Sequence, residues 1–192
     1  MIYSINESFF SKKPNKYAIE NAKDLDKAVK TFLKYFSECY KLITSMGGIV
    51  SKDNFTDSDT EKVDALYKKW SDLNEILDEL NQKDRNLAFK LLKVYGTKEY
   101  CEEDLPDSVT QEYKTFHKKI CKNGEYIKQF MQHSRNLFKQ AERYDDLRKK
   151  YDHMDTSHKT ACEKYGGFIG TMIGSIPFYN PFKKLPEGMK ED

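Results

Sequence analysis

The chain has 192 residues, of which 33% are charged and 38% are hydrophobic, and its formal net charge is +2. An aromatic content of 14% is too high for a wholly disordered chain, and the low hydrophobic fraction suits a helical bundle with a large surface. Only four of the basic residues are arginines, which argues against a nucleic-acid binder because phosphate and base recognition favour arginine.

The first segment, residues 1–16, is predicted to be an amphipathic arm. Ile2, Ile5, Phe9 and Phe10 recur at roughly helical spacing, and three lysines follow them. A segment of this kind can lie in a lipid interface, so these four residues are candidate membrane contacts. The alternative is that the arm packs on the rest of the protein.

Two long helices are expected next, over residues 17–46 and 60–95. Each carries apolar residues in alternating steps of four and three, which is the spacing of a coiled-coil seam. Gly47 and Gly48 follow the first seam and predict the end of that helix. The Thr/Asp/Ser/Asp cluster at 56–59 then supplies capping oxygens and negative charge for the second helix.

A third helix is predicted from about residue 105 to residue 164. Its seam keeps the same alternation from Val109 to Tyr151. The pair Asn123-Gly124 often marks a turn, and a break there would give four helices in place of three. Because the seam keeps its phase across this pair, we prefer one continuous helix. Two basic clusters on this helix are candidate contacts for an anionic partner: Lys118, Lys119, Lys122, Arg148, Lys149 and Lys150.

The C-terminal tail, residues 166–192, is the most apolar part of the chain. Glycines recur there every four residues, a spacing that lets helices approach closely and is common in lipid. The apolar run is too short to cross a bilayer, so it either dips into one leaflet or folds back on the bundle. Six tail residues are candidate membrane contacts: Phe168, Ile169, Met172, Ile173, Ile176 and Phe178.

No catalytic or metal-binding pattern is present in the sequence. The four histidines lack the spacing of a metal site, and the chain contains no phosphate-binding loop, nucleophile motif or zinc-protease motif. We therefore expect no enzyme activity, no metal and no cofactor. Cys39, Cys101, Cys121 and Cys162 include no CxxC pair. They are either free thiols in a reducing compartment or disulfide-bonded cysteines in a secreted chain.

Two stretches resemble segments of the BAR-domain superfamily. Residues 91–116 (LLKVYGTKEYCEEDLPDSVTQEYKTF) are similar to a segment of the superfamily in which acidic residues are followed by Asp-Leu and then by Lys and Phe. Residues 142–151 (ERYDDLRKKY) are similar to its basic segment that contains Tyr-Asp. Members of this superfamily form antiparallel dimers that scaffold curved membranes. The resemblance implies a BAR-like scaffold with lipid-binding surfaces.

The sequence thus predicts an all-α protein, an elongated antiparallel three-helix coiled-coil bundle. Its expected parts are the arm at 1–16, a helical domain at 17–165 and the tail at 166–192. The predicted function is a non-enzymatic scaffold that associates peripherally with membranes. The alternative is a helical protein-interaction module, such as an adaptor, effector or surface antigen, with no membrane role.

Three kinds of partner are compatible with this prediction: a second copy in a homodimer, another helical protein, or an anionic membrane surface. Nucleic acid is not expected. The first residues lack the basic stretch and apolar run of a secretion signal, and no run of 18 apolar residues occurs. A cytoplasmic location with peripheral membrane association is therefore expected, and secretion is left open.

Overall fold

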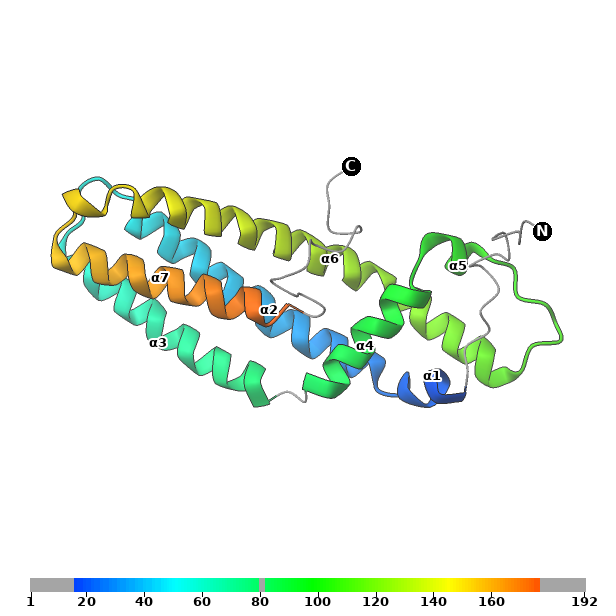
Figure 1. Cartoon of the computed structure of the whole chain (residues 1–192). Helices are drawn as coiled ribbons and strands as arrows, with labels where there is room; N and C mark the ends of the chain where they lie inside the picture. The colour runs from blue at the N-terminus through cyan, green and yellow to red at the C-terminus, as the bar shows by residue number, and fades with distance from the viewer. Residues whose placement is uncertain (1–15, 80–81, 177–192) are drawn as a thin grey trace, which may run out of the picture. The chain divides into compact units, whose positions relative to one another are not determined.

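A computed structural model of the chain describes residues 16–79 and 82–176, and the regular structure of these residues is entirely helical (Figure 1). The all-α prediction is therefore confirmed for this part of the chain. The α-helices are α1 (Lys16–Asn21), α2 (Leu25–Val50), α3 (Asp57–Glu79), α4 (Gln82–Tyr95), α5 (Lys98–Glu102), α6 (Gln111–Arg148) and α7 (Thr156–Gly174). A single 3₁₀ turn, Tyr151–His153, lies between α6 and α7.

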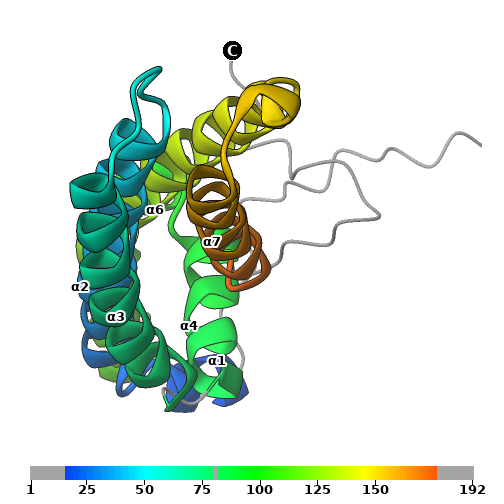
Figure 2. The same cartoon turned by 90° about the vertical axis from the view of Figure 1, so that its left-hand side faces the viewer.

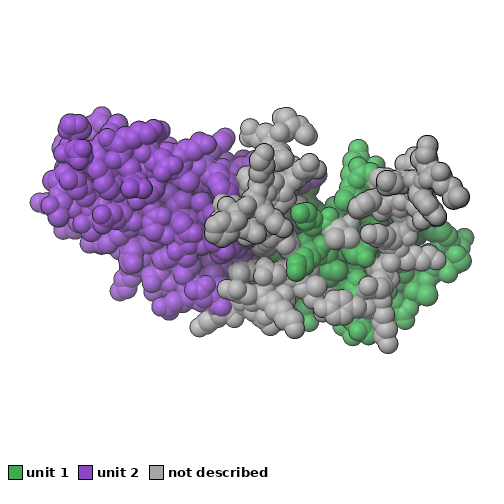
Figure 3. Space-filling view, in the orientation of Figure 1, with its two compact units in different colours: residues 1–30, 83–127 green, residues 31–82, 128–192 purple. Residues whose placement is uncertain are grey.

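The helices form two compact units, and each unit is assembled from two stretches that are distant in the sequence (Figure 3). Unit 1 consists of residues 1–30 and 83–127, and unit 2 consists of residues 31–82 and 128–192. Both α2 and α6 contribute residues to each unit. No single break in the sequence therefore separates the two units.

Unit 2 is a bundle of four helices, α3 and α7 together with parts of α2 and α6 (Figures 1 and 2). The Phe130 ring of α6 lies 5.7 Å from that of Phe32 and 5.3 Å from that of Phe36, both on α2. The Phe168 ring of α7 stacks on the Trp70 ring of α3, with 3.9 Å between ring centroids. Aromatic contacts between helices thus fill much of this core.

The predicted seam of α2 is buried at every position. No member is more than 1% exposed, as expected for a helix that turns one apolar stripe toward the core. The members are Leu25, Val29, Phe32, Phe36, Cys39, Ile43 and Met46.

The first predicted helix differs from α2 at both ends. Residues 16–21 form the separate helix α1, and α2 continues through Gly47 and Gly48 to Val50. A Cβ atom on Gly47 would lie 2.8 Å from the Tyr165 hydroxyl and 2.8 Å from Gln140 Oε1. Gly47 therefore allows a close approach inside the bundle, and the prediction that it ends the helix is wrong.

The second predicted helix, 60–95, corresponds to α3 and α4. Thr56 precedes α3, and the backbone N–H groups of Asp59 and Thr60 donate to its carbonyl at 2.9 and 3.1 Å. Asp57 and Asp59 supply the predicted negative charge in the first turn, but the Thr56 hydroxyl donates to the Asp59 carboxylate at 2.9 Å, so it is not the predicted capping acceptor. Gly96 follows the end of α4, and its N–H donates to the Leu92 carbonyl at 2.7 Å. Residues 80–81, between the two helices, lie outside the described part of the chain.

The helix α6 runs without a break across Asn123-Gly124, as preferred from the phase of the seam. Asn123 is fully buried, and its side-chain amide donates to the Lys119 carbonyl at 2.8 Å and to the Asp26 carboxylate of α2. These partners hold the side chain inside unit 1 as part of the helix. The pair therefore does not form the turn that its sequence permits.

The third predicted helix, 105–164, is two helices, α6 and α7. The chain leaves α6 after Arg148, and α7 begins where the Asp155 side chain accepts a hydrogen bond from the His158 backbone N–H at 2.8 Å. The first eleven residues of the predicted tail, 166–176, belong to α7 or directly follow it. The all-helical class is thus confirmed for the described residues, whereas the three-helix coiled coil is not.

Candidate protein-interaction surface

The apolar C-terminal segment lies in the core of unit 2. Phe168, Ile169, Met172 and Ile176 are each at most 3% exposed, and Ile173 is half-buried. Four of these five candidates are therefore engaged in the core of unit 2 in this fold, and a role of this segment in membrane contact stays a prediction. The physical reason is that α7 has neighbouring helices to pack against, so its apolar face needs no lipid.

The contacts of this segment show how it is held. Besides the stack on Trp70, the Phe168 ring lies 4.8 Å from that of Tyr67, another α3 residue. A Cβ atom on Gly166 would overlap the Tyr144 ring of α6, whereas one on Gly170 would meet no atom within 4 Å. The repeated glycines therefore provide one close approach, at Gly166, and not a continuous packing stripe.

The remaining membrane-contact candidates, Ile2, Ile5, Phe9, Phe10 and Phe178, lie outside the described residues.

The first basic cluster, Lys118, Lys119 and Lys122, is partly engaged within unit 1. The Lys119 ammonium donates to the Lys23 carbonyl at 2.6 Å, and the Lys122 ammonium lies 3.9 Å from the Asp26 carboxylate. Lys118 is exposed. Two of the three lysines thus already have partners in the chain itself, which weakens this cluster as an anion-binding surface.

The second basic cluster consists of Arg148, the last residue of α6, and the two residues after it, Lys149 and Lys150, and all three are exposed. The Lys149 ammonium lies 2.7 Å from the Asp146 carboxylate. This pair lowers the pKa of Asp146 and raises the pKa of Lys149, chiefly through their hydrogen bond. The cluster keeps a net positive charge that faces solvent.

A groove of about 450 Å³ lies between α2 and α3 of unit 2. Two half-buried leucines form its apolar part, one from each helix, and each helix adds one acidic and one basic side chain. The lining residues are Glu38, Lys41, Leu42, Lys69, Asp72 and Leu73. We call this the α2–α3 groove.

The charges of the α2–α3 groove follow a regular order. On α2, Lys41 lies three residues nearer to the α2–α3 loop than Glu38, and on α3, Lys69 lies three residues nearer to it than Asp72. Both walls are thus positive toward the loop and negative away from it. None of these four side chains forms an ion pair with another described residue.

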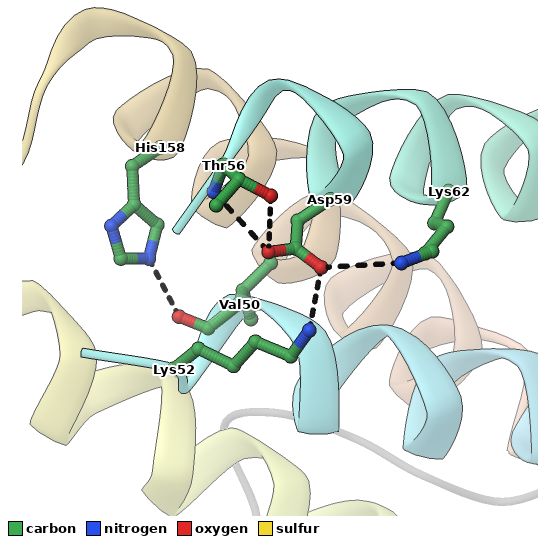
Figure 4. Close-up of polar contacts among 6 residues, drawn as sticks. All are labelled: Val50, Lys52, Thr56, Asp59, Lys62 and His158. Atoms are coloured by element: carbon green, nitrogen blue, oxygen red, sulfur yellow. Dashed lines mark hydrogen bonds and ion pairs between the residues drawn. The ribbon is translucent and has the colours of Figure 1, made fainter. Parts of the chain in front are cut away.

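The α2–α3 loop itself is tied down by a buried carboxylate (Figure 4). The Asp59 side chain is 4% exposed and accepts from the Thr56 hydroxyl at 2.9 Å and from the Thr56 backbone N–H at 3.2 Å. Its other oxygen lies 2.5 Å from the Lys52 ammonium and 3.7 Å from that of Lys62. The hydrogen bond from Lys52, with those from Thr56, lowers the pKa of Asp59 to about 2.

A histidine fixes the same loop to α7. His158 is buried, and its Nε2 donates to the Val50 carbonyl at 2.7 Å (Figure 4). Its ring stacks on that of Phe55 at 4.4 Å. The Asp59 carboxylate and the His158 ring are therefore engaged in structural contacts, and we assign them no catalytic role.

The sequence left open whether the four cysteines are free thiols or disulfide-bonded, and the structure contains two of each kind. Cys101 and Cys121 form a disulfide that joins α5 to α6 within unit 1. Close by, His117 Nε2 donates to the Tyr100 carbonyl at 2.8 Å.

The other two cysteines, Cys39 and Cys162, are buried free thiols. Burial, with smaller contributions from neighbouring glutamates, raises the pKa of Cys39 to about 12 and that of Cys162 to about 11. These thiols stay protonated at neutral pH and are poor nucleophiles.

Sequence reasoning missed both the groove and the pairing of Cys101 with Cys121. Leu73 belongs to the predicted seam of α3, and its partial exposure depends on how far apart the helices pack. Leu42 lies one residue away from the α2 seam and carries no sequence signal of its own. Any two of the four cysteines could form a single disulfide, and spacing alone does not choose the pair.

Two further findings concern the described part of the chain. No group of three or more His, Cys, Asp or Glu side chains there could hold a metal ion. Within the same residues, no helix is both long enough and apolar enough to cross a membrane.

In comparisons with known proteins, no family model, curated protein or solved structure matches this chain.

Proposed function

We propose that this chain is a non-enzymatic protein-interaction module that binds an amphipathic helix of a partner protein in the α2–α3 groove. The observation that carries the proposal is the groove itself, in which half-buried leucines lie between four charged side chains that have no ion-pair partner among the described residues. Grooves of this composition between two helices accept the apolar face of a third helix. The buried position of the C-terminal segment supports this function over membrane insertion, because the segment already has its partners.

The charge order of the groove specifies the partner helix. Its apolar stripe covers Leu42 and Leu73, an acidic residue faces Lys41 and Lys69, and a basic residue about one turn away faces the two carboxylates. Such a helix carries opposite charges at the two ends of its apolar stripe. A uniformly charged helix meets like charge at one end of the groove, which opposes binding.

Three synthetic helical peptides with the same leucine stripe test this function. One carries acidic flanks at one end and basic flanks at the other, the second is acidic throughout, and the third is basic throughout. A uniformly charged peptide meets two groove side chains of its own charge where the mixed peptide meets two of opposite charge. This difference changes the binding free energy by roughly 0.6–2 kcal/mol, so the mixed peptide should bind about threefold to thirtyfold tighter at low salt. Fluorescence anisotropy of labelled peptides measures the dissociation constants.

Groove variants then locate the binding. The pair Glu38→Lys and Asp72→Lys makes the groove positive and should shift its preference to the acidic peptide. The pair Lys41→Glu and Lys69→Glu should shift it to the basic peptide. A matched control reverses the exposed residues Lys139 and Glu142 on α6, which do not line the groove. Equal binding of all three peptides, or a preference that the groove variants leave unchanged, would contradict the proposed function.

A second proposal is peripheral binding to an anionic membrane surface through Arg148, Lys149 and Lys150. The specific observation in its favour is that all three side chains are exposed on consecutive residues at the end of α6. Each basic residue near an anionic surface contributes about 1 kcal/mol. Co-sedimentation with phosphatidylserine vesicles should therefore fall when all three are changed to glutamate, and removal of residues 1–14 tests the arm separately. Unchanged pelleting of the triple variant would contradict this proposal, whatever the effect of removing the arm.

The BAR-like architecture, an elongated antiparallel coiled-coil scaffold, belongs with this second proposal. Small-angle scattering combined with light scattering tests it. A compact monomer of 192 residues has a radius of gyration of about 16 Å. A clearly larger radius with dimeric mass would support the scaffold, and a compact monomer would exclude it.

A further inference from the structure

We propose that Asn54 is an N-glycosylation site. The residues Asn54-Phe55-Thr56 match the acceptor pattern Asn-x-Ser/Thr, in which the middle residue is not proline. They lie in the loop between α2 and α3, where Asn54 and the three residues before it are exposed. The Asn54 amide has no hydrogen-bond partner among the described residues.

The disulfide between Cys101 and Cys121 provides an independent observation. Structural disulfides form and persist in oxidising compartments, including the endoplasmic reticulum lumen and the cell exterior, and are rare in the cytosol. Oligosaccharide transfer to asparagine takes place in that secretory route. A disulfide in unit 1 and an open acceptor loop in unit 2 thus point to the same cellular environment, the secretory route that the sequence left open beside a cytoplasmic location.

The reaction is the transfer of an oligosaccharide from a polyprenyl diphosphate carrier. The Asn54 side-chain nitrogen forms a bond to C1 of the first sugar, and the bond from C1 to the diphosphate oxygen breaks. The polyprenyl diphosphate leaves with the electron pair, and the amide nitrogen loses one proton to a base of the transferase. No oxidation or reduction is involved.

The surroundings of Thr56 determine when this transfer takes place. The Thr56 hydroxyl and backbone N–H both donate to Asp59, so the hydroxyl that defines the acceptor pattern is already engaged once α3 has formed (Figure 4). Phe55 is likewise held by its stack on His158. The acceptor is therefore available to the transferase in the nascent chain, before the loop folds, and the glycan then remains on the exposed Asn54.

Peptide mapping of the protein isolated from the cells that make it tests the site directly. Release of the glycan by peptide N-glycosidase converts the modified asparagine to aspartate. The peptide that contains position 54 should therefore be detected with aspartate at this position, and only after enzyme treatment. Recovery of this peptide with unmodified asparagine before treatment would overturn the proposal. Recovery of all four cysteines as free thiols would also overturn it, because the compartment would then be reducing.

Acceptor variants secreted from eukaryotic cells test the role of each residue. All of them carry Asn6→Gln, because Asn6, outside the described residues, begins a second acceptor pattern. Asn54→Gln and Thr56→Val should lose the enzyme-sensitive mobility shift, whereas Thr56→Ser should retain it. A shift that persists in Asn54→Gln, or that is absent from the Asn6→Gln parent, would contradict the assignment.

The predicted order of events has its own test. A purified oligosaccharyltransferase with lipid-linked oligosaccharide should modify a synthetic peptide of residues 50–60 at least tenfold faster than the folded, unglycosylated protein. Equal rates would show that the contacts of Thr56 do not restrict the acceptor.

Discussion

Replacing Phe168 with alanine tests whether the apolar C-terminal segment belongs to the core. The side chain is 2% exposed and stacks on Trp70 with 3.9 Å between ring centroids. Truncation of a buried phenylalanine costs about 3–5 kcal/mol, the sum of lost transfer free energy and the cavity left behind. For a chain of this size, that loss corresponds to a decrease in Tm of roughly 6–20 °C.

Urea unfolding measures this loss, with Trp70, the only tryptophan, as the fluorescent probe. Far-UV circular dichroism serves as a second probe because the substitution also changes the surroundings of Trp70. The control is Ile173→Ala on the same helix, where the half-buried side chain should cost less than about 2 kcal/mol. A loss below about 1 kcal/mol for Phe168→Ala, or one no larger than that of the control, would refute the core position and favour a lipid-facing segment.

Three further predictions concern other parts of the fold. Gly166→Ala should destabilise the protein by about 1–3 kcal/mol because its methyl group overlaps a tyrosine ring, whereas Gly170→Ala, in open space, should stabilise it by about 0.5–1 kcal/mol; Tm shifts of the same sign would contradict this. The pKa of Asp59 is lowered from 3.8 to about 2, so its ion pairs contribute stability above pH 4 that is lost as the pH falls from about 4 to 2. Thermal unfolding across this range should show a shallower pH dependence in Asp59→Asn, and an unchanged slope would count against the role of the carboxylate. Replacing both Cys101 and Cys121 with serine should cost about 3 kcal/mol and abolish the effect of dithiothreitol on Tm; a reductant effect that persists would exclude this disulfide as its cause.

The α2–α3 groove and the Asn54 loop assign different roles to two parts of unit 2. In the first proposal, charge order and half-buried leucines suit the groove to recognise a partner helix, and in the second the exposed loop is the site of a modification. The two proposals fail separately. Peptide binding to the groove does not depend on the glycan, and transfer of the glycan does not depend on a partner helix.

The sequence alone determined the helical class and the inner face of α2. Its seven apolar positions keep one phase over six turns, and this period fits only a helix with one buried stripe. The same argument kept α6 continuous across Asn123-Gly124, because the local preference for a turn is small compared with the packing of a whole seam. The second predicted helix was expected to end at residue 95, and α4 ends there, directly before Gly96.

Only the tertiary structure decided the structural role of residues that contact a part of the chain distant in the sequence. Gly47 resembles a helix end until Tyr165 and Gln140 fill the space beside it, and Phe168 resembles a lipid contact until Trp70 covers it. Likewise, the exposure of Leu73 depends on the separation of two helices. A sequence pattern records the period of a helix, but it does not record which surface another helix will cover, because that depends on how the chain turns between helices.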